Sequence, residues 1–242
     1  MTINSIKNDR LVMRSVSGVI AVGVTLSLMA CSATQKALVT RSEAHCGLLG
    51  HYCDRLTPGT EDQMGLRYVR PGVDWRKYKA VIIEPVTFWG DEEGGASAEV
   101  RQELVNEFET VLKQEFGKKF QVVTRPGPGV MTLSVGMTKA ESATPVLRSI
   151  SMIVPQARAL STGAYLVSGQ FPFVGTAQVE GKVEDSVSGQ VLAAIVDKRL
   201  GGGSPTAGFQ WQWGDVENAM QHWSEHHADR LASWTSGQQK AQ

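Results

Sequence analysis

An apolar pattern over residues 98–117 constrains this chain most strongly, because its spacing of three and four residues fits a helix. Ser97 stands where a helix N-cap is expected, Glu99 lies in the first turn and Gly117 ends the last turn. The apolar residues that recur on one face are Val100, Leu104, Val105, Phe108, Val111, Leu112 and Phe116. The pattern predicts an amphipathic helix of about 20 residues, which needs an apolar surface to cover.

Strand patterns on both sides of that helix supply such a surface. Residues 131–138 alternate between apolar and small or polar side chains, which is typical of a half-buried strand. Residues 79–86 contain a continuous apolar run, which indicates a strand covered on both faces. The other predicted elements are a strand at 120–124, a hairpin of 177–185 with 190–199, and a last helix capped by Asp215 that carries Val216, Ala219, Met220, Trp223, His227, Leu231 and Trp234 on one face. We expect an α+β (or α/β) fold, a mixed β-sheet with amphipathic helices packed on it, as a single domain.

Residues 141–176 interrupt this regular order. Prolines and glycines divide their apolar stretches, so we expect a long, partly packed excursion with at most one short helix. Long irregular segments inside a domain are often functional. Ile150 and Ile153 are therefore candidate binding residues, and the alternative is that the segment only covers one edge of the sheet.

The first 30 residues have the parts of an export signal. Three basic residues precede residues 15–29, which carry no charge. This apolar run is about 15 residues long, whereas a helix that spans a membrane needs about 20, so a cleaved signal is favoured over a permanent anchor. The ending Leu-Met-Ala-Cys resembles the lipobox of bacterial lipoproteins, which implies cleavage between Ala30 and Cys31 and fatty acids such as palmitate on Cys31.

The residue after the cysteine bears on the location. In enterobacterial lipoproteins an aspartate there retains the protein at the inner membrane, so Ser32 favours the outer membrane with the domain facing the periplasm, and the inner membrane is the alternative. We expect a signal peptide at 1–30, a lipidated tether at 31–45, a periplasmic domain at 46–236 and a disordered tail at 237–242. The mature chain has a net charge of about minus two, which gives no basic field to attract nucleic acid.

The two remaining cysteines, Cys46 and Cys53, are close in sequence. In an oxidising periplasm such a pair usually forms a disulfide. An alternative is a zinc site in which His45 and His51 join the two sulfur atoms, since imidazole and thiolate are preferred zinc ligands. The redox compartment and the unusual spacing favour the disulfide.

A search for catalytic chemistry gives few candidates. The chain lacks the nucleophile elbow, the phosphate-binding loop, the dinucleotide turn and the H-E-x-x-H zinc motif. His222 and His226 lie four residues apart on the last predicted helix, with Glu225 nearby, and could bind a metal, although exposed polar positions explain them equally well. His227 fits better among apolar neighbours than as a ligand.

Two aspartates and several tryptophans have structural and functional interpretations. Asp74 and Asp185 could act as an acid and base pair, but each stands where a cap or a turn favours aspartate. We expect Trp75, Trp223 and Trp234 in the core. The candidate exposed contacts are Trp89, Trp211 and Trp213.

Several segments together resemble one family. They are Gly47-Leu48-Leu49 with Tyr52 and Leu56, YVRPGVDWRKYKAVIIEPVTFW, RPGPGVMTLSVGMT, VEDSVSGQVLAAIVDKR and WGDVENAMQHWSEHHADRL. In this order they are similar to the lipoproteins of domain of unknown function 3313 (DUF3313), over about residues 47–231. The resemblance implies no catalytic residues. The element order also resembles, more weakly, periplasmic lipoproteins with an anticodon-binding-like fold, which bind other envelope proteins.

Three functional hypotheses follow. The leading one is a membrane-anchored, non-enzymatic lipoprotein that binds or positions another envelope component, most simply a protein, with no cofactor besides the covalent lipid on Cys31. The second is a carrier of lipid or another apolar ligand, with a pocket lined by residues 141–176. The third is a cell-envelope hydrolase.

Overall fold

The computed structural model describes residues 34–90, 96–143, 174–201 and 213–241. The chain divides into two units, Met1–Ala30 and Cys31–Gln242, and every described residue belongs to the second. Within these described ranges no helix is long and apolar enough to cross a membrane.

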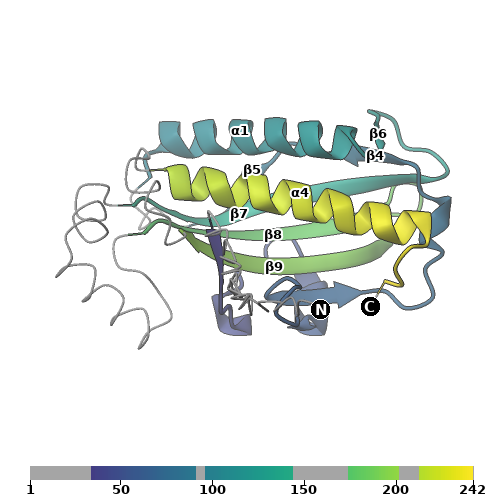
Figure 1. Cartoon of the computed structure of the whole chain (residues 1–242), viewed down its shortest axis with the longest axis horizontal. Coiled ribbons are helices and arrows are strands. Elements are labelled where there is room, and N and C mark those ends of the chain that lie inside the picture. Colours follow the sequence, from purple (N-terminus) through teal and green to yellow (C-terminus); the bar gives the residue numbers. More distant parts are fainter. Residues whose placement is uncertain (1–33, 91–95, 144–173, 202–212, 242) are drawn as a thin grey trace, which may run out of the picture. The chain divides into compact units, whose positions relative to one another are not determined.

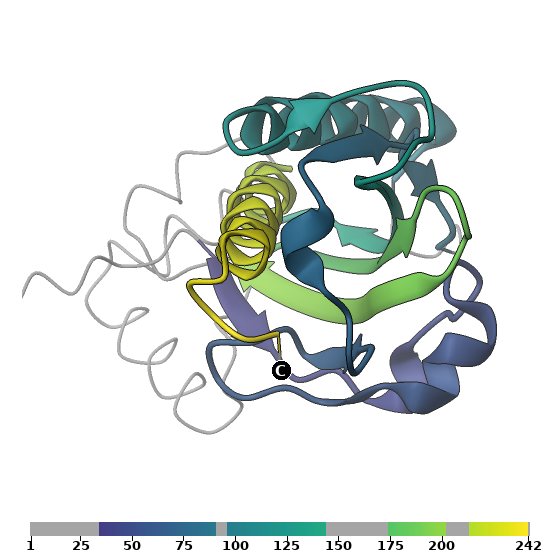
Figure 2. The same ribbon diagram turned by 90° about the vertical axis from the view of Figure 1, so that its right-hand side faces the viewer.

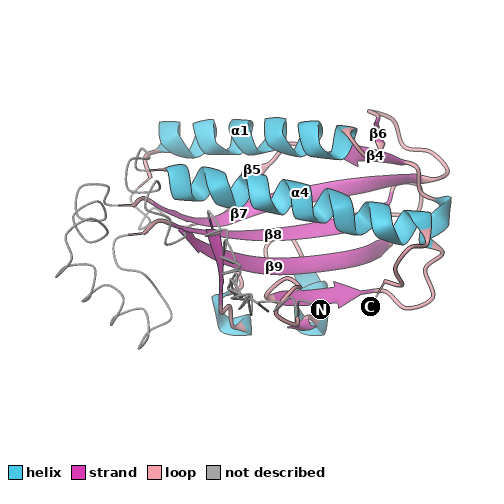
Figure 3. Ribbon diagram, in the orientation of Figure 1, coloured by secondary structure: helices cyan, strands magenta, loops and turns pink. Residues whose placement is uncertain are grey.

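The described strands form one mixed sheet of nine strands, as expected (Figures 1 and 3). Their order is β2-β3-β9-β8-β7-β4-β6, with β1 beside β9 and β5 beside β7. The bounds are β1 Thr34–Ala37, β2 Thr57–Pro58, β3 Leu66–Val69, β4 Ala80–Ile83, β5 Thr87–Phe88, β6 Gln121–Val122, β7 Val130–Glu141, β8 Thr176–Asp185 and β9 Val191–Gly201. β7, β8 and β9 run antiparallel, whereas β4 is parallel to both β6 and β7, which makes the sheet mixed.

Two long helices, α1 (Ala98–Gly117) and α4 (Gly214–Ser236), cover one face of this sheet side by side (Figure 1). The predicted cap is confirmed, since Ser97 Oγ accepts from the Val100 N–H at 3.4 Å. The main core forms between the helices and the sheet. Along β7, buried residues that contribute to this core alternate over much of the strand with half-exposed ones. The largest fully buried side chains in this core include Trp223, Tyr78, Phe108, Phe116, Leu104, Leu112, Met131, Met137, Leu192 and Met220.

The opposite face of β8 and β9 is covered by the N-terminal segment (Figure 2). This segment contains the 3₁₀ turns η1 (Arg41–Glu43) and η2 (Gly50–Arg55). A second, smaller apolar cluster fills the space between, made of Val39, Leu49, Cys53, Leu56, Leu66, Val191, Ala194 and Val196. The sheet therefore has one face under two helices and another partly under short turns.

Three expectations about element ends are wrong. We expected order to begin near Cys46, but β1 already starts at Thr34 and pairs with β9, because a four-residue edge strand shows no readable period. We expected Asp215 to cap the last helix, but the cap is Trp213, and Asp215 instead accepts from the Gly175 N–H at 2.7 Å. The tail is also partly ordered, since the Gln239 N–H donates to the carbonyl of Ser233.

Candidate functional site

Trp89 is the sequence-predicted contact that the structure places at the surface. Its side chain follows β5, is 40% exposed, and its Nε1 donates to Thr87 Oγ1 at 2.6 Å. Two glycines make room for the indole: a Cβ on Gly136 would lie 2.7 Å from the ring, and a Cβ on Gly47 would lie 2.9 Å from it. The ring of His45 lies beside it, with centroids 5.9 Å apart. Trp89 is therefore a preorganised aromatic side chain, held in one position yet open to solvent.

The other candidate contacts have different outcomes. Trp213 is only 2% exposed, so the expectation of an exposed contact is wrong there. It precedes the first turn of α4, and that turn packs into the main core together with it. Trp211, Ile150 and Ile153 lie outside the described residues.

A disulfide joins Cys46 and Cys53, whose Cα atoms lie 5.6 Å apart. It holds a loop against the sheet, since the Cys46 N–H donates to Oε1 of the fully buried Glu180 at 2.5 Å. The alternative zinc site with His45 and His51 would need both sulfur atoms as ligands, and the disulfide uses both of them. Among the described residues, no group of three or more His, Cys, Asp or Glu side chains could hold a metal ion.

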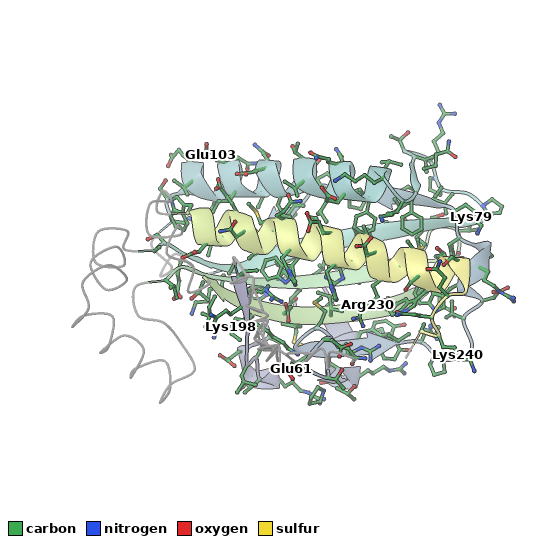
Figure 4. The ribbon with its side chains drawn as sticks, in the orientation of Figure 1. Glu61, Lys79, Glu103, Lys198, Arg230 and Lys240 are labelled. Carbon is green, nitrogen blue, oxygen red and sulfur yellow. A yellow bond between two sulfur atoms is a disulfide. The ribbon has the colours of Figure 1, made fainter. Side chains whose placement is uncertain are left out.

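A cavity of about 60 Å³ lies between the sheet and the two helices. Its walls are mostly apolar, and its polar lining includes His227 and Arg230 of α4 and Arg67 of β3. Arg230 donates to the carbonyl of Asp62 at 2.8 Å, and Figure 4 shows it between α4 and the segment that carries Glu61. Sites for small organic ligands usually enclose about 300–1,000 Å³, so this cavity is large enough only for a few water molecules.

The histidines of α4 are neutral near pH 7. Burial, reinforced by nearby positive charges, lowers the pKa of His222 to about 4 and that of His227 to about 3, and it also lowers the pKa of His226. The rings of His222 and His226 stack with centroids 5.5 Å apart. Glu225, the acid considered with them, accepts from Gln221 Nε2 at 2.6 Å. His227 lies among apolar residues of the cavity, as expected.

Asp197 is a buried carboxylate that the sequence reading missed. Its oxygens accept from Trp223 Nε1 at 2.8 Å and from the Gly65 N–H at 2.7 Å, and Arg199 Nη1 lies 3.7 Å away. Burial raises the pKa of this fully buried side chain. Asp197 and Arg199 share the inward face of β9 with Ala193, but both faces of this strand are buried, so no apolar–polar alternation marks them in the sequence. Its partners belong to α4 and to the turn before β3, so it fastens both to the sheet.

The two aspartates considered for catalysis have the structural roles favoured above. Asp74 Oδ1 accepts from the Arg76 N–H at 3.3 Å and caps the 3₁₀ turn η3 (Trp75–Lys77). Asp185 accepts from the Ser188 N–H at 3.0 Å and from the Tyr78 hydroxyl at 2.8 Å. These hydrogen bonds, led by the one from the Ser188 backbone, hold the pKa of Asp185 far below its usual value. Each carboxylate accepts from donors of its own turn, and Asp185 also accepts from the distant Tyr78.

The chain belongs to the family described as "Protein of unknown function (DUF3313)", whose model matches residues 45–227. It is 22% identical over 174 residues to the uncharacterized lipoprotein YdcL of Escherichia coli K12, covering 71% of this chain and 76% of that protein. The family expected from the sequence motifs is therefore confirmed.

The solved structures that match this chain are more distant in sequence. Protein XCC0632 from Xanthomonas campestris, of family DUF330, is 12% identical with a TM-score of 0.39, covering 71% of this chain and 94% of that one. The PelC dodecamer from Paraburkholderia phytofirmans is 10% identical with a TM-score of 0.37, covering 66% of this chain and 93% of that one.

Proposed function

We propose that this protein is a lipid-anchored envelope lipoprotein whose periplasmic domain binds or positions another envelope protein without catalysing a reaction. One observation carries the anchoring: Cys31 ends the sequence Leu-Met-Ala-Cys after a charge-free run, and the sheet begins three residues later at Thr34. Several acyl chains on one residue give a stable anchor, whereas a single chain holds a protein only marginally. The similarity to an E. coli lipoprotein supports this proposal.

The proposed membrane location rests on the residue that follows Cys31. Ser32 stands where enterobacterial lipoproteins of the inner membrane carry aspartate, so the outer membrane is the proposed location. The domain then faces the periplasm, where the Cys46–Cys53 disulfide is stable.

The proposed contact with a partner protein includes Trp89. Residues that dominate binding energy at protein interfaces are enriched in tryptophan. A ring already fixed by Thr87, Gly47 and Gly136 loses little conformational entropy when a partner covers it. His45 beside the ring adds a polar side chain at the edge of this surface.

Fatty-acid labelling tests the anchor. Wild-type cells are expected to incorporate labelled palmitate into the protein, and the Cys31→Ser variant is expected to incorporate none. The matched variant Ser32→Asp is expected to keep the label but to move from the outer to the inner membrane fraction. Equal incorporation into Cys31→Ser would contradict the lipoprotein assignment.

Site-specific photocrosslinking in intact cells tests the binding surface. A crosslinking amino acid at position 89 is expected to capture a defined protein, identified by mass spectrometry. The same amino acid at Val187, which is 66% exposed, serves as the control and should not capture that protein. Identical capture patterns at the two positions would contradict a binding role for the surface around Trp89.

A further inference from the structure

The short distance from Cys31 to the sheet determines how the domain meets the membrane. Only Ser32 and Ala33 separate the cysteine from β1, and three residue steps of fully extended chain span about 10 Å. Thr34 therefore lies within about 10 Å of the first atom that carries lipid.

Thr34 is held firmly in the sheet. Its side chain is 3% exposed, and its Oγ1 donates to the carbonyl of Leu200 at 3.0 Å. Arg199 Nε lies 3.4 Å from the same oxygen and donates to it. The backbone register pairs Thr34 with Gly201. Because these contacts are buried, the domain cannot move away from the bilayer by releasing the start of β1 at low cost.

Thr34 belongs to a row of paired residues that crosses the sheet at one end. Thr34 pairs with Gly201, Thr176 pairs with Leu200, and Glu141 pairs with Thr176. Figure 1 shows the ends of β7 and β9 and the start of α4 at this end of the sheet.

Asp215 of α4 packs tightly against Gly175 and Gly201, next to this row. It accepts from the Gly175 N–H at 2.7 Å, and a Cβ on Gly201 would lie only 2.3 Å from its carboxylate. The described residues of this row are therefore packed against the first turn of α4.

We propose that the end of the sheet formed by Thr34, Gly201, Thr176 and Glu141 faces the bilayer, with the β8–β9 turn directed away from it. This rests on the proposed lipidation of Cys31 and adds an orientation to it. From Thr176 to Asp185, β8 advances nine residues, or about 30 Å at the usual rise of a strand. The partner of this surface is the lipid headgroup layer.

Energy transfer to a lipid-attached acceptor tests the orientation in the full lipidated protein on phosphatidylethanolamine–phosphatidylglycerol vesicles. One variant carries a fluorescent donor at Glu141→Cys, in the row of residues proposed to face the bilayer (the bilayer row), and a second variant carries it at Val187→Cys, in the β8–β9 turn. Cys46 and Cys53 are joined and Cys31 carries lipid, so the introduced thiol is the one that reacts. Quenching is expected to be strong at position 141 and several-fold weaker at position 187.

Two controls separate the orientation from the anchoring. Co-flotation with vesicles reports lipidation alone, so a wild-type chain that does not float contradicts the proposed function and the orientation with it. A glycine–serine insertion of about 20 residues before Thr34 allows excursions of about 25 Å, so it should keep flotation but remove the difference between the two donors. Equal quenching at positions 141 and 187 in a floating protein without the insertion overturns the orientation alone. An unchanged difference after the insertion overturns the role of the short β1 connection.

Discussion

Acidification should destabilise this domain through two partly buried histidines, His222 and His227. An ordinary histidine has a pKa near 6.5, whereas the folded-state values are about 4 and about 3, chiefly because burial disfavours the charged imidazolium. A group with a depressed pKa binds fewer protons in the folded state than in the unfolded state. The stability that it contributes is complete above pH 6.5 and is lost as the pH falls toward the folded pKa.

The size of the effect follows from the same values. Between pH 7 and pH 5 the unfolded chain protonates each histidine while the folded chain does not, which changes the free energy of unfolding by about 1–2 kcal/mol for each after allowance for partial exposure. The two together should lower it by about 2–4 kcal/mol. Asp197 acts in the opposite direction, because its raised pKa lets the folded state bind a proton more readily as the pH falls.

The variant His227→Leu isolates one of the two contributions. Leucine cannot be charged and it faces the apolar walls of the cavity, so the loss of stability between pH 7 and pH 5 should fall by about 1–2 kcal/mol relative to wild type. The matched variant His51→Leu removes an exposed histidine from η2 and should leave that loss unchanged. Urea unfolding of the Cys31→Ser chain, followed by tryptophan fluorescence at both pH values, measures the difference. The same loss in wild type and in His227→Leu would refute the assignment of this acid sensitivity to the buried imidazole.

Other variants test the remaining structural assignments. Replacing Cys46 and Cys53 by serine should lower the free energy of unfolding by about 2.5 kcal/mol, the chain-entropy estimate for a loop of about eight residues, and an unchanged urea midpoint would contradict it. Gly136→Ala should displace the indole of Trp89, which a shifted Nε1–H resonance in the NMR spectrum would report; an unmoved resonance means that the glycine is not needed there. Asp197→Ala should cost about 3–5 kcal/mol, because it leaves buried donors and a positive charge without their acceptor, and a loss below about 1 kcal/mol would show that water replaces the carboxylate.

Local sequence patterns predicted most of the regular elements. The three-and-four spacing after Ser97 gave α1, and the alternation around Leu133 and Val135 gave the centre of β7. The turn Asp185–Gly189 marked the hairpin, because an aspartate that accepts from the next backbone N–H groups favours such a turn. In each case the information lies within one element or between neighbours in the chain, so it can be read without the fold.

The misses depend on contacts between distant residues. β1 has four residues, and its pairing partner Gly201 lies far along the chain, so no local period marks it. Asp197 reads as a surface residue until Trp223 and the Gly65 backbone are placed around it. Trp213 is polar at one end and apolar at the other, and only the packing of the first turn of α4 decides that it is buried.

The two proposals together restrict where a partner can be. The Trp89 N–H donates to the carbonyl of Met137 in β7, four residues before Glu141, or about 13 Å along the strand from the bilayer row. If both proposals hold, the short connection from Cys31 places Trp89 within about 25 Å of the membrane. We therefore expect the partner to be a protein that is itself held at or near the same membrane. Exporting the domain without its anchor, behind an ordinary cleavable secretory signal in place of residues 1–31, should then reduce crosslinking from position 89 strongly, even though the surface itself is intact, because the local concentration at the membrane is lost. The 20-residue insertion before Thr34 should reduce it less. Equal crosslinking in the untethered and anchored chains would show that the partner is freely soluble in the periplasm, and the membrane would then have no part in bringing the two together.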